Sequence, residues 1–264
     1  MSVLDLFSLE GEVALVTGGT HGLGMAVATA LAEAGATLVI NGHSAGRLEK
    51  ALEIYRDKGI EAKGYLFDVT DERQVAESVA RIENEVGPVG ILVNNAGIIK
   101  RIPALEMTLP EWNDVIATDL TAPFLMSRAV AAGMIRRGRG KIVNMCSMMS
   151  EVGRNSVTAY AAAKGGLKML TKNLATEWAS HNIQVNGIGP GYFATEQTAP
   201  IRVDGHPFND FIIGRTPASR WGDPEDLGGT AVFLASRASD FVNGHILYVD
   251  GGILASLGRA ANEY

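Results

Sequence analysis

Short apolar runs alternate with helical patterns along the whole chain, and this alternation constrains the fold more than any other feature. Strand-like runs occupy 13–18, 37–41, 64–69, 91–97, 141–147, 183–191 and 245–252. Helical patterns fill the intervals, the last three covering 110–137, 157–181 and 223–236. The runs are continuously apolar, as expected of strands buried on both faces. We therefore predict an α/β fold: a doubly wound, seven-stranded parallel sheet with helices on both faces.

No linker divides the 264 residues, so we expect one domain over 1–264. The segment 191–222 contains three prolines and shows no clear period. Loops of this length in compact domains are commonly functional lids. We predict that this segment is the substrate loop.

Composition and charge argue against several classes of partner. The formal charge is −6 and the only basic cluster is the short run RRGRGK at 136–141, so we expect no nucleic-acid partner. One cysteine and five scattered histidines predict neither an internal disulfide nor a metal site. The N-terminus lacks a signal-like apolar segment, and no apolar run approaches about 18 residues. These features favour a cytoplasmic protein without a membrane partner.

A glycine-rich turn, TGGTHGLG, follows the first strand. Its Gly18, Gly22 and Gly24 let the backbone approach a pyrophosphate and leave the N–H groups of a helix N-terminus free to bind it. A turn of this kind also occurs for purely structural reasons, but its place after strand one favours a single-domain Rossmann fold that binds a dinucleotide. The predicted cofactor contacts here are Gly18, Thr20, His21, Gly22, Leu23 and Gly24.

Polar residues recur where later strands end. Asp68 and Val69 close the third strand, and NNAG at 94–97 closes the fourth. Ligands bind beyond the carboxyl ends of strands in such sheets, so we add Asp68, Val69, Asn95, Ala96 and Gly97 to the predicted cofactor crevice. The Asp68 carboxylate would accept from an adenine amino group. The alternative for Asp68 is a helix cap before the sequence DERQ.

Tyr160 and Lys164 are four residues apart and lie on one face of the predicted helix, while Ser147 ends the preceding strand. This arrangement suits proton transfer. A Tyr-x-x-x-Lys pair by itself is commonly just a helix surface pair. Cys146, beside Ser147, alternates onto the other face of its strand and is expected in the core.

Together these motifs resemble the short-chain dehydrogenase/reductase family. The resemblance covers nearly the whole chain and includes PGYFAT at 190–195 and VDGG at 249–252. It implies that Tyr160 is the general acid in ketone reduction and the general base in alcohol oxidation, that Lys164 also holds the nicotinamide ribose, and that Ser147 donates to the substrate oxygen. It adds Pro190, Gly191 and Thr195 to the cofactor contacts. It also implies a homotetramer built through 110–137, 157–181, the last strand and the C-terminal tail.

For Tyr160 to act as a base near neutral pH, the pKa of a free phenol, about 10, must fall by about three units, or about 4 kcal/mol. The Lys164 ammonium and the positive ring of an oxidised nicotinamide both favour the phenolate. The family has an Asn on the long helix where this chain has Asp119. That position contributes a backbone carbonyl in relatives. The Asp119 side chain either holds Lys164 charged or points away and caps locally, and we favour the second.

The choice of cofactor depends on the end of the second strand. An acid there would bind the ribose 2′-hydroxyl and repel a 2′-phosphate. The chain instead reads Asn41-Gly42-His43-Ser44, so we predict NADP(H) in preference to NAD(H), with His43, Ser44 and His21 near the phosphate. His43 is alternatively a solvent-facing loop residue, and a histidine near neutral pH is only partly cationic.

The segments 182–195, 215–227 and 239–252 resemble those of enzymes that interconvert D-gluconate and 5-keto-D-gluconate. A sugar acid calls for an arginine in its pocket. Arg101 and Arg154 are the candidates, each with a surface position as the alternative, and Tyr192, Glu151 and Asn155 would meet hydroxyls. Alternative substrates are a deoxy-ketouronate, 2-deoxygluconate or another ketone. A non-catalytic dinucleotide-binding regulator is the rival from another class.

Overall fold

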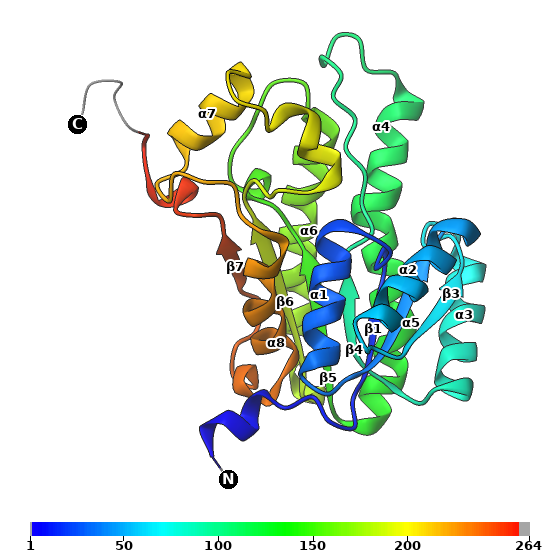
Figure 1. Ribbon diagram of the computed structural model, residues 1–264. Coiled ribbons are helices and arrows are strands. Elements are labelled where there is room, and N and C mark those ends of the chain that lie inside the picture. Colours follow the sequence, from blue (N-terminus) through cyan, green and yellow to red (C-terminus); the bar gives the residue numbers. More distant parts are fainter. Residues whose placement is uncertain (1, 259–264) are drawn as a thin grey trace.

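The structure, a computed structural model, describes residues 2–258 and confirms the predicted sheet (Figure 1). Seven parallel strands lie in the order β3-β2-β1-β4-β5-β6-β7. The order reverses between β1 and β4, which creates the crevice expected of a doubly wound sheet. The strands are β1 (Val13–Val16), β2 (Thr37–Gly42), β3 (Ala62–Leu66), β4 (Val89–Asn94), β5 (Gly140–Met145), β6 (Ile183–Pro190) and β7 (Ile246–Val249).

Two apolar cores cover the two faces of the sheet. Side chains alternate along β1, so that Val16 packs into one core and Leu15 into the other. The first core lies under α1 (Gly22–Glu33), α2 (Ala45–Asp57) and α8 (Gly228–Ala235). The second lies under α3 (Glu72–Glu85), α5 (Ala122–Arg137) and α6 (Thr158–Trp178). Burial of both faces explains why the strands are continuously apolar in sequence.

The segment 191–222 contains more regular structure than the sequence suggested. A 3-10 turn occupies Glu196–Ile201, and α7 (Pro207–Arg215) stands above the carboxyl edge of the sheet (Figure 1). His206 caps α7 by accepting from the Phe208 N–H through Nδ1 at 3.1 Å, and Pro207 occupies the first turn. The helix has only nine residues, and Phe208 in its first turn packs edge-on against Tyr192, so no apolar period was visible in the sequence.

The predicted helix over 110–137 is interrupted in its middle. It consists of α4 (Leu109–Ile116), a π-helical turn (Ala117–Thr121) and α5. The Ala122 N–H bonds the Ala117 carbonyl five residues back, and Pro123 has no N–H for the carbonyl of Asp119. Single π turns often mark functional positions. The run Leu109–Arg137 has the length and apolarity of a membrane-crossing helix, but half of its most apolar window is buried inside the fold.

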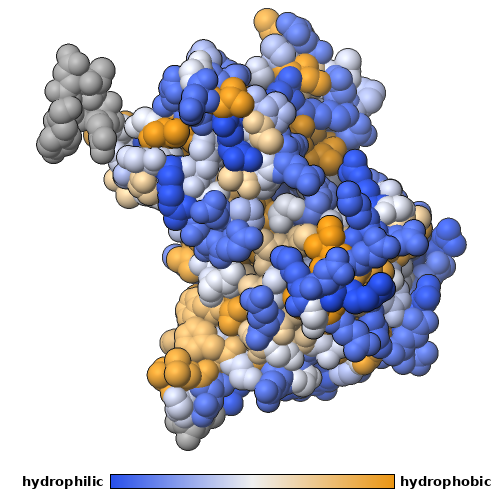
Figure 2. Space-filling view, viewed as in Figure 1, coloured by the Kyte–Doolittle hydropathy of each residue, from blue (hydrophilic) through white to orange (hydrophobic). Residues whose placement is uncertain are grey.

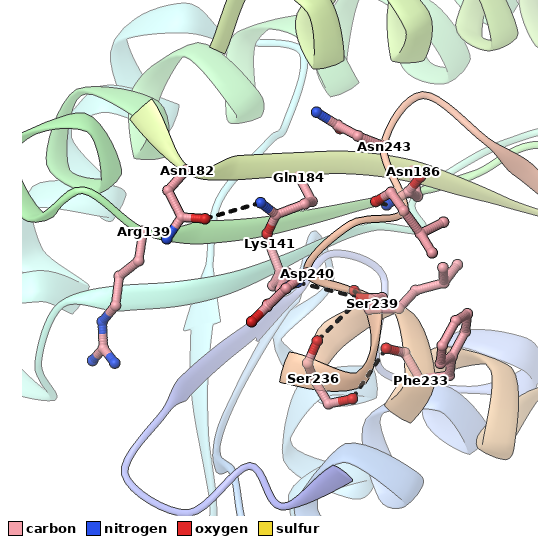
Figure 3. A network of polar contacts seen from close by, with 12 residues as sticks. Arg139, Lys141, Asn182, Gln184, Asn186, Phe233, Ser236, Ser239, Asp240 and Asn243 are labelled. Atoms are coloured by element: carbon pink, nitrogen blue, oxygen red, sulfur yellow. Dashed lines mark hydrogen bonds and ion pairs between the residues drawn. The ribbon is translucent and has the colours of Figure 1, made fainter. Parts of the chain in front are cut away.

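At the opposite, amino edge of the sheet, a polar network fastens the end of α8 to β5 and β6 (Figure 3). The Lys141 ammonium donates to Ser239 Oγ at 3.3 Å and to Asp240 Oδ1 at 2.8 Å. Asn186 donates to the Val242 carbonyl at 2.7 Å. Burial lowers the pKa of Lys141, because the contact with Asp240 offsets only part of the lost hydration.

Candidate active site

The glycine turn forms a backbone surface that no larger residue would permit. Gly18 has φ +62°, and a Cβ on Gly24 would lie 2.3 Å from Asn95 Nδ2 and 2.4 Å from the Gly18 carbonyl oxygen. His21 precedes α1 without capping it through its side chain, so the first N–H groups of α1 remain available to an anion. These features fit the pyrophosphate of a dinucleotide.

The turn is held against the NNAG segment by side chains of both. Asn95 Nδ2 donates to the carbonyls of Thr17 and Gly18 at 3.0 and 3.1 Å, and Thr17 Oγ1 accepts from the backbone N–H groups of Asn95 and Ala96. Thr17 is a residue that sequence reasoning missed. Its only signal was its position as the last residue before the glycines.

A third segment reaches the same place from β6. Pro190 ends β6, and Thr195 lies beside the glycine turn, since a Cβ on Gly22 would be 3.8 Å from Thr195 Cγ2. The structure thus brings together Gly22, Asn95 and Thr195 from three distant parts of the sequence. The predicted cofactor contacts on these segments lie around one crevice.

No carboxylate occupies the end of β2. The Asn41 side chain turns inward, donating to the Phe67 carbonyl at 2.9 Å and accepting from the Gly18 N–H at 3.4 Å. His43 is exposed, and Ser44 begins α2 without a capping bond from its side chain. Both side chains are therefore available to a ligand at this edge.

Asp68 is exposed and is not the cap of α3. That cap is Asp71, whose carboxylate accepts from the Gln74 N–H at 3.0 Å. Asp68 Oδ1 instead accepts from the N–H and hydroxyl of Thr70, at 2.8 and 2.7 Å. The helix-cap alternative for Asp68 is therefore wrong, and its contact with adenine stays a prediction. Val69 beside it is buried.

The residues predicted to transfer the proton converge where β5 ends. Ser147 follows β5 and accepts from the Met149 N–H at 3.1 Å, while Tyr160 and Lys164 lie on α6. Lys164 Nζ donates to the Met145 carbonyl at 2.8 Å and lies 5.4 Å from the centroid of the Tyr160 ring. Lys164 is 4% exposed, so its charge must be balanced inside the protein.

Asp119 supplies that balance, and the expectation that its side chain points away is wrong. Asp119 is fully buried, with Oδ2 3.1 Å from Lys164 Nζ. Its other oxygen accepts from the Ile98 N–H at 2.8 Å. The π turn places this carboxylate under the loop that follows NNAG, a position that sequence periodicity alone does not define.

Comparison with known proteins agrees with this geometry. A family profile described as enoyl-(acyl carrier protein) reductase matches residues 18–254. The 2-dehydro-3-deoxy-D-gluconate 5-dehydrogenase of Formosa agariphila is 64% identical over 264 residues, which cover 100% of both chains. The chain belongs to the short-chain dehydrogenase/reductase family. The resemblance seen in the sequence is confirmed, and the protein is an NAD(P)-dependent oxidoreductase of that family.

Two further relatives of this dehydrogenase/reductase carry related names. The 5-keto-D-gluconate 5-reductase of Escherichia coli K12 is 51% identical over 253 residues, 96% of this chain and 99% of that one. A crystal structure of a gluconate 5-dehydrogenase from Burkholderia cenocepacia, in complex with NADP and tartrate, is 44% identical with a TM-score of 0.92. It covers 97% of this chain and 100% of its own.

The sequence led us to expect a lowered pKa for Tyr160, but in the folded protein this pKa is raised. Burial raises the pKa of Tyr160; the Lys164 charge and hydrogen bonding with Ser147 lower it, but Asp119 raises it further. Burial alone would lower the pKa of Lys164, yet Asp119 and Tyr160 outweigh burial and raise it. The protein's own groups therefore favour a protonated phenol beside a charged ammonium.

A buried amide network joins the ends of the strands that carry NNAG and Ser147. Asn94 Nδ2 donates to Asn144 Oδ1 at 2.8 Å, and Asn144 Nδ2 donates to Thr171 Oγ1 at 2.9 Å. Asn144 is fully buried and links β4, β5 and α6 below Ser147. Sequence reasoning missed Asn144, although a polar residue inside the apolar run KIVNM was a signal.

The predicted substrate residues fall into two groups. Arg154 follows Ser147 in the loop before α6 and reaches α7, with its guanidinium carbon 4.1 Å from the centroid of the Phe208 ring and NH1 3.4 Å from the Tyr192 hydroxyl. Tyr192 also packs edge-on against Trp221. Arg101 is exposed and makes no hydrogen bond or ion pair within residues 2–258.

Glu151 and Asn155, the other residues predicted to meet substrate hydroxyls, lie in different surroundings. Glu151 accepts from Lys168 and Tyr248, each at 2.5 Å, so its carboxylate is already paired. Asn155 is exposed. Cys146 is buried as predicted, and burial raises the pKa of its thiol to about 11, which makes it an inert core residue.

Proposed function

We propose that this protein is an NADP-preferring oxidoreductase that interconverts D-gluconate and 5-keto-D-gluconate. The observation that carries the proposal is the convergence of Ser147, Tyr160 and Lys164 with the glycine turn in a chain 51% identical to a 5-keto-D-gluconate 5-reductase. A dinucleotide bound on the glycine turn supplies the hydride in reduction and accepts it in oxidation. The remaining chemistry belongs to the protein's side chains.

In reduction, the Tyr160 hydroxyl donates its proton to the carbonyl oxygen as that oxygen gains negative charge. The Ser147 hydroxyl donates a hydrogen bond to the same oxygen and stabilises the developing charge. Lys164, with Nζ 5.4 Å from the centroid of the Tyr160 ring, keeps a positive charge beside the phenol that has lost its proton. In oxidation the same phenol, deprotonated, accepts the proton of the alcohol.

The NADP preference rests on the end of β2. The Asn41 side chain points inward, and no carboxylate stands at the end of β2 to repel a 2′-phosphate. The side chains of His43 and Ser44 are free to contact that phosphate. The crystal structure of the Burkholderia relative contains NADP. The test is kcat/KM with each cofactor, and a clear preference for NAD would refute the proposal. His43→Ala should reduce kcat/KM with NADPH more than with NADH.

Arg154 and Arg101 are the proposed partners of the substrate carboxylate. Arg154 is held in place by Phe208 and Tyr192 and has no carboxylate partner within the described residues, so an incoming carboxylate would find an oriented guanidinium. Tyr192 and the segment 191–222 would then close over the hydroxyls. Arg154→Ala and Arg101→Ala should each raise KM for 5-ketogluconate; a variant that leaves KM unchanged removes its arginine from the site.

A second candidate substrate is 2-dehydro-3-deoxy-D-gluconate, oxidised at C5. The 64% identity with an enzyme of that name favours it. The two substrates share the C1 carboxylate and the reacting C5 but differ at C2 and C3. A panel of 5-ketogluconate, a deoxy-ketouronate and a plain diketone, followed through nicotinamide absorbance, ranks them by kcat/KM. Absence of turnover on 5-ketogluconate would refute the proposed substrate.

We also propose assembly as a homotetramer. Phe124 of α5 and Met169 of α6 are exposed apolar residues on helices assigned to assembly. Figure 2 shows a further apolar area over α8 and the N-terminal turn, where Val3 and Leu4 are exposed. Most of the C-terminal tail assigned to assembly, 259–264, lies outside the described residues. Light scattering after size-exclusion chromatography tests the oligomeric state; the cytoplasmic location stays a prediction.

A further inference from the structure

The pair formed by Asp119 and Lys164 is enclosed on every side. Asp119 is fully buried and Lys164 nearly so, with 3.1 Å between the carboxylate and the ammonium. Lys164 is additionally held by the Met145 carbonyl and Asp119 by the Ile98 N–H. Charges that are this far removed from water are screened weakly, so each strongly affects a neighbouring titratable group.

Tyr160 is the titratable group that both charges affect. The Lys164 ammonium favours its phenolate, and the Asp119 carboxylate disfavours it. Two further groups affect the pKa of Tyr160: hydrogen bonding with the Ser147 hydroxyl lowers it, and the buried Cys146 raises it. Together the lysine and the aspartate carry no net charge, so Tyr160 lies beside a balanced ion pair rather than a lone cation.

We propose that Asp119 is a positioning residue that balances the charge of Lys164 and keeps Tyr160 in its proton-donating form, so that ketone reduction stays efficient up to alkaline pH and alcohol oxidation requires a higher pH. This inference rests on the proposed acid-base role of Tyr160. An asparagine at this position, as in the family pattern, would still accept from the Ile98 N–H but would leave the ammonium uncompensated. The raised pKa of Tyr160 agrees with the geometry.

The test is Asp119→Asn, which keeps the shape of the side chain and its acceptor oxygen. The pH profile of kcat/KM for oxidation should shift toward lower pH, with a gain of about tenfold near neutral pH, the change that a shift of one unit produces. KM should change little, because Asp119 lies beneath Lys164 rather than against substrate. Asp240→Asn, which removes the carboxylate beside Lys141, is the matched control and should leave the profile unchanged.

A readout without substrate separates this inference from the proposed function. Tyrosinate absorbance is titrated in the full chain, and the signal of Tyr160 is isolated by subtracting the Tyr160→Phe titration, measured in both the wild-type and Asp119→Asn backgrounds. Tyr160 should ionise at lower pH in Asp119→Asn. If Asp119→Asn changes neither the ionisation of Tyr160 nor the oxidation profile, the inference is overturned. If Tyr160 ionises at lower pH in Asp119→Asn but the wild type turns over no substrate, only the proposed function is overturned.

Folding of the variant is checked by circular dichroism before either experiment. If Asp119→Asn does not fold, Asp119→Ser removes the same charge from a smaller side chain and is measured in its place. Tyr160 ionising at or above the wild-type pH in a folded charge-removing variant contradicts the proposal. A lower ionisation pH together with a shifted oxidation profile supports it.

Discussion

Two buried lysines at opposite edges of the sheet behave in opposite ways. Lys164, at the carboxyl edge, is 4% exposed, and Lys141, at the amino edge, is 8% exposed. Each lies about as close to one aspartate, at 3.1 and 2.8 Å. The pKa of Lys164 is nevertheless raised by Asp119 and Tyr160 against the effect of burial, whereas burial lowers the pKa of Lys141 despite Asp240.

The partner carboxylate accounts for the difference. The Asp119 side chain is fully buried, while that of Asp240 is 55% exposed. Water screens the Asp240 charge, so it compensates little of the hydration that Lys141 loses. Lys164 also has the Tyr160 phenol beside it. Burial of a lysine therefore does not set the direction of its pKa shift; burial of the opposing charge does.

The largest contrast is expected from removing each ammonium. Lys164→Met should lower kcat by about 10²–10⁴-fold, the range for losing an acid-base function, and should destabilise the fold by about 3–5 kcal/mol, because it leaves Asp119 buried without a counter-charge. Lys141→Met should retain turnover and cost little stability, since Asp240 remains hydrated. Steady-state kinetics and urea denaturation measure both. Equal destabilisation by the two variants would contradict the comparison.

Removing each carboxylate should again destabilise the protein more at the Lys164 pair than at the Lys141 pair. Asp119→Ala removes the counter-charge of Lys164 and the acceptor for the Ile98 N–H, and should cost about 3–5 kcal/mol. Asp240→Ala should cost about 0–1 kcal/mol, as for other half-exposed ion pairs. Urea denaturation at one pH compares them. A cost for Asp240→Ala as large as that for Asp119→Ala would show that exposure of the carboxylate is not what separates the pairs.

The buried amide network offers a test at intermediate magnitude. Asn144→Ala would remove the shortest of the hydrogen bonds that Asn94 Nδ2 donates, leaving that amide to Ser127 Oγ and the Pro123 carbonyl, and would leave Thr171 Oγ1 without its donor; it should cost about 1–3 kcal/mol. Because the network lies below Ser147, kcat should fall while KM changes less. Asn243→Ala, at the amino edge, removes the acceptor of the Val185 N–H and serves as control, with turnover retained. If Asn243→Ala also loses turnover, the effect of Asn144→Ala on kcat is not specific to the carboxyl edge of the sheet.

The smallest effect is in the pH dependence of stability, where the two lysines should have opposite slopes. The folded pKa of Lys141 lies below its ordinary value of 10.5, so its contribution to the free energy of unfolding increases as pH rises toward 10.5. The folded pKa of Lys164 lies above 10.5, so its contribution is complete below 10.5 and is lost as pH rises beyond it. Denaturation of the wild type and each Lys→Met variant across alkaline pH measures the slopes; slopes of the same sign would be inconsistent with this account.

Much of the active site was predictable because its residues follow strand ends in a fold whose strand ends converge. The glycine turn, NNAG and the Ser147, Tyr160 and Lys164 spacing each have a local signature. The positions of Thr17, Asn41 and Asn144 in the sequence did not reveal their hydrogen-bond partners, because those partners lie far away in the sequence. The helix α7 was missed for a related reason: its aromatic contacts with Tyr192 lie across a loop.

The sequence by itself determined the doubly wound sheet and the dinucleotide crevice, and it singled out the residues that we propose transfer the proton. Strand burial and tight turns leave periodic and positional signals that need no knowledge of distant contacts. Only the tertiary structure decided that Asp119 faces Lys164, and that the exposed Asp240 offsets only part of the hydration that Lys141 loses. The direction of a pKa shift depends on how fully both charges are removed from water, and the folded arrangement alone sets that burial.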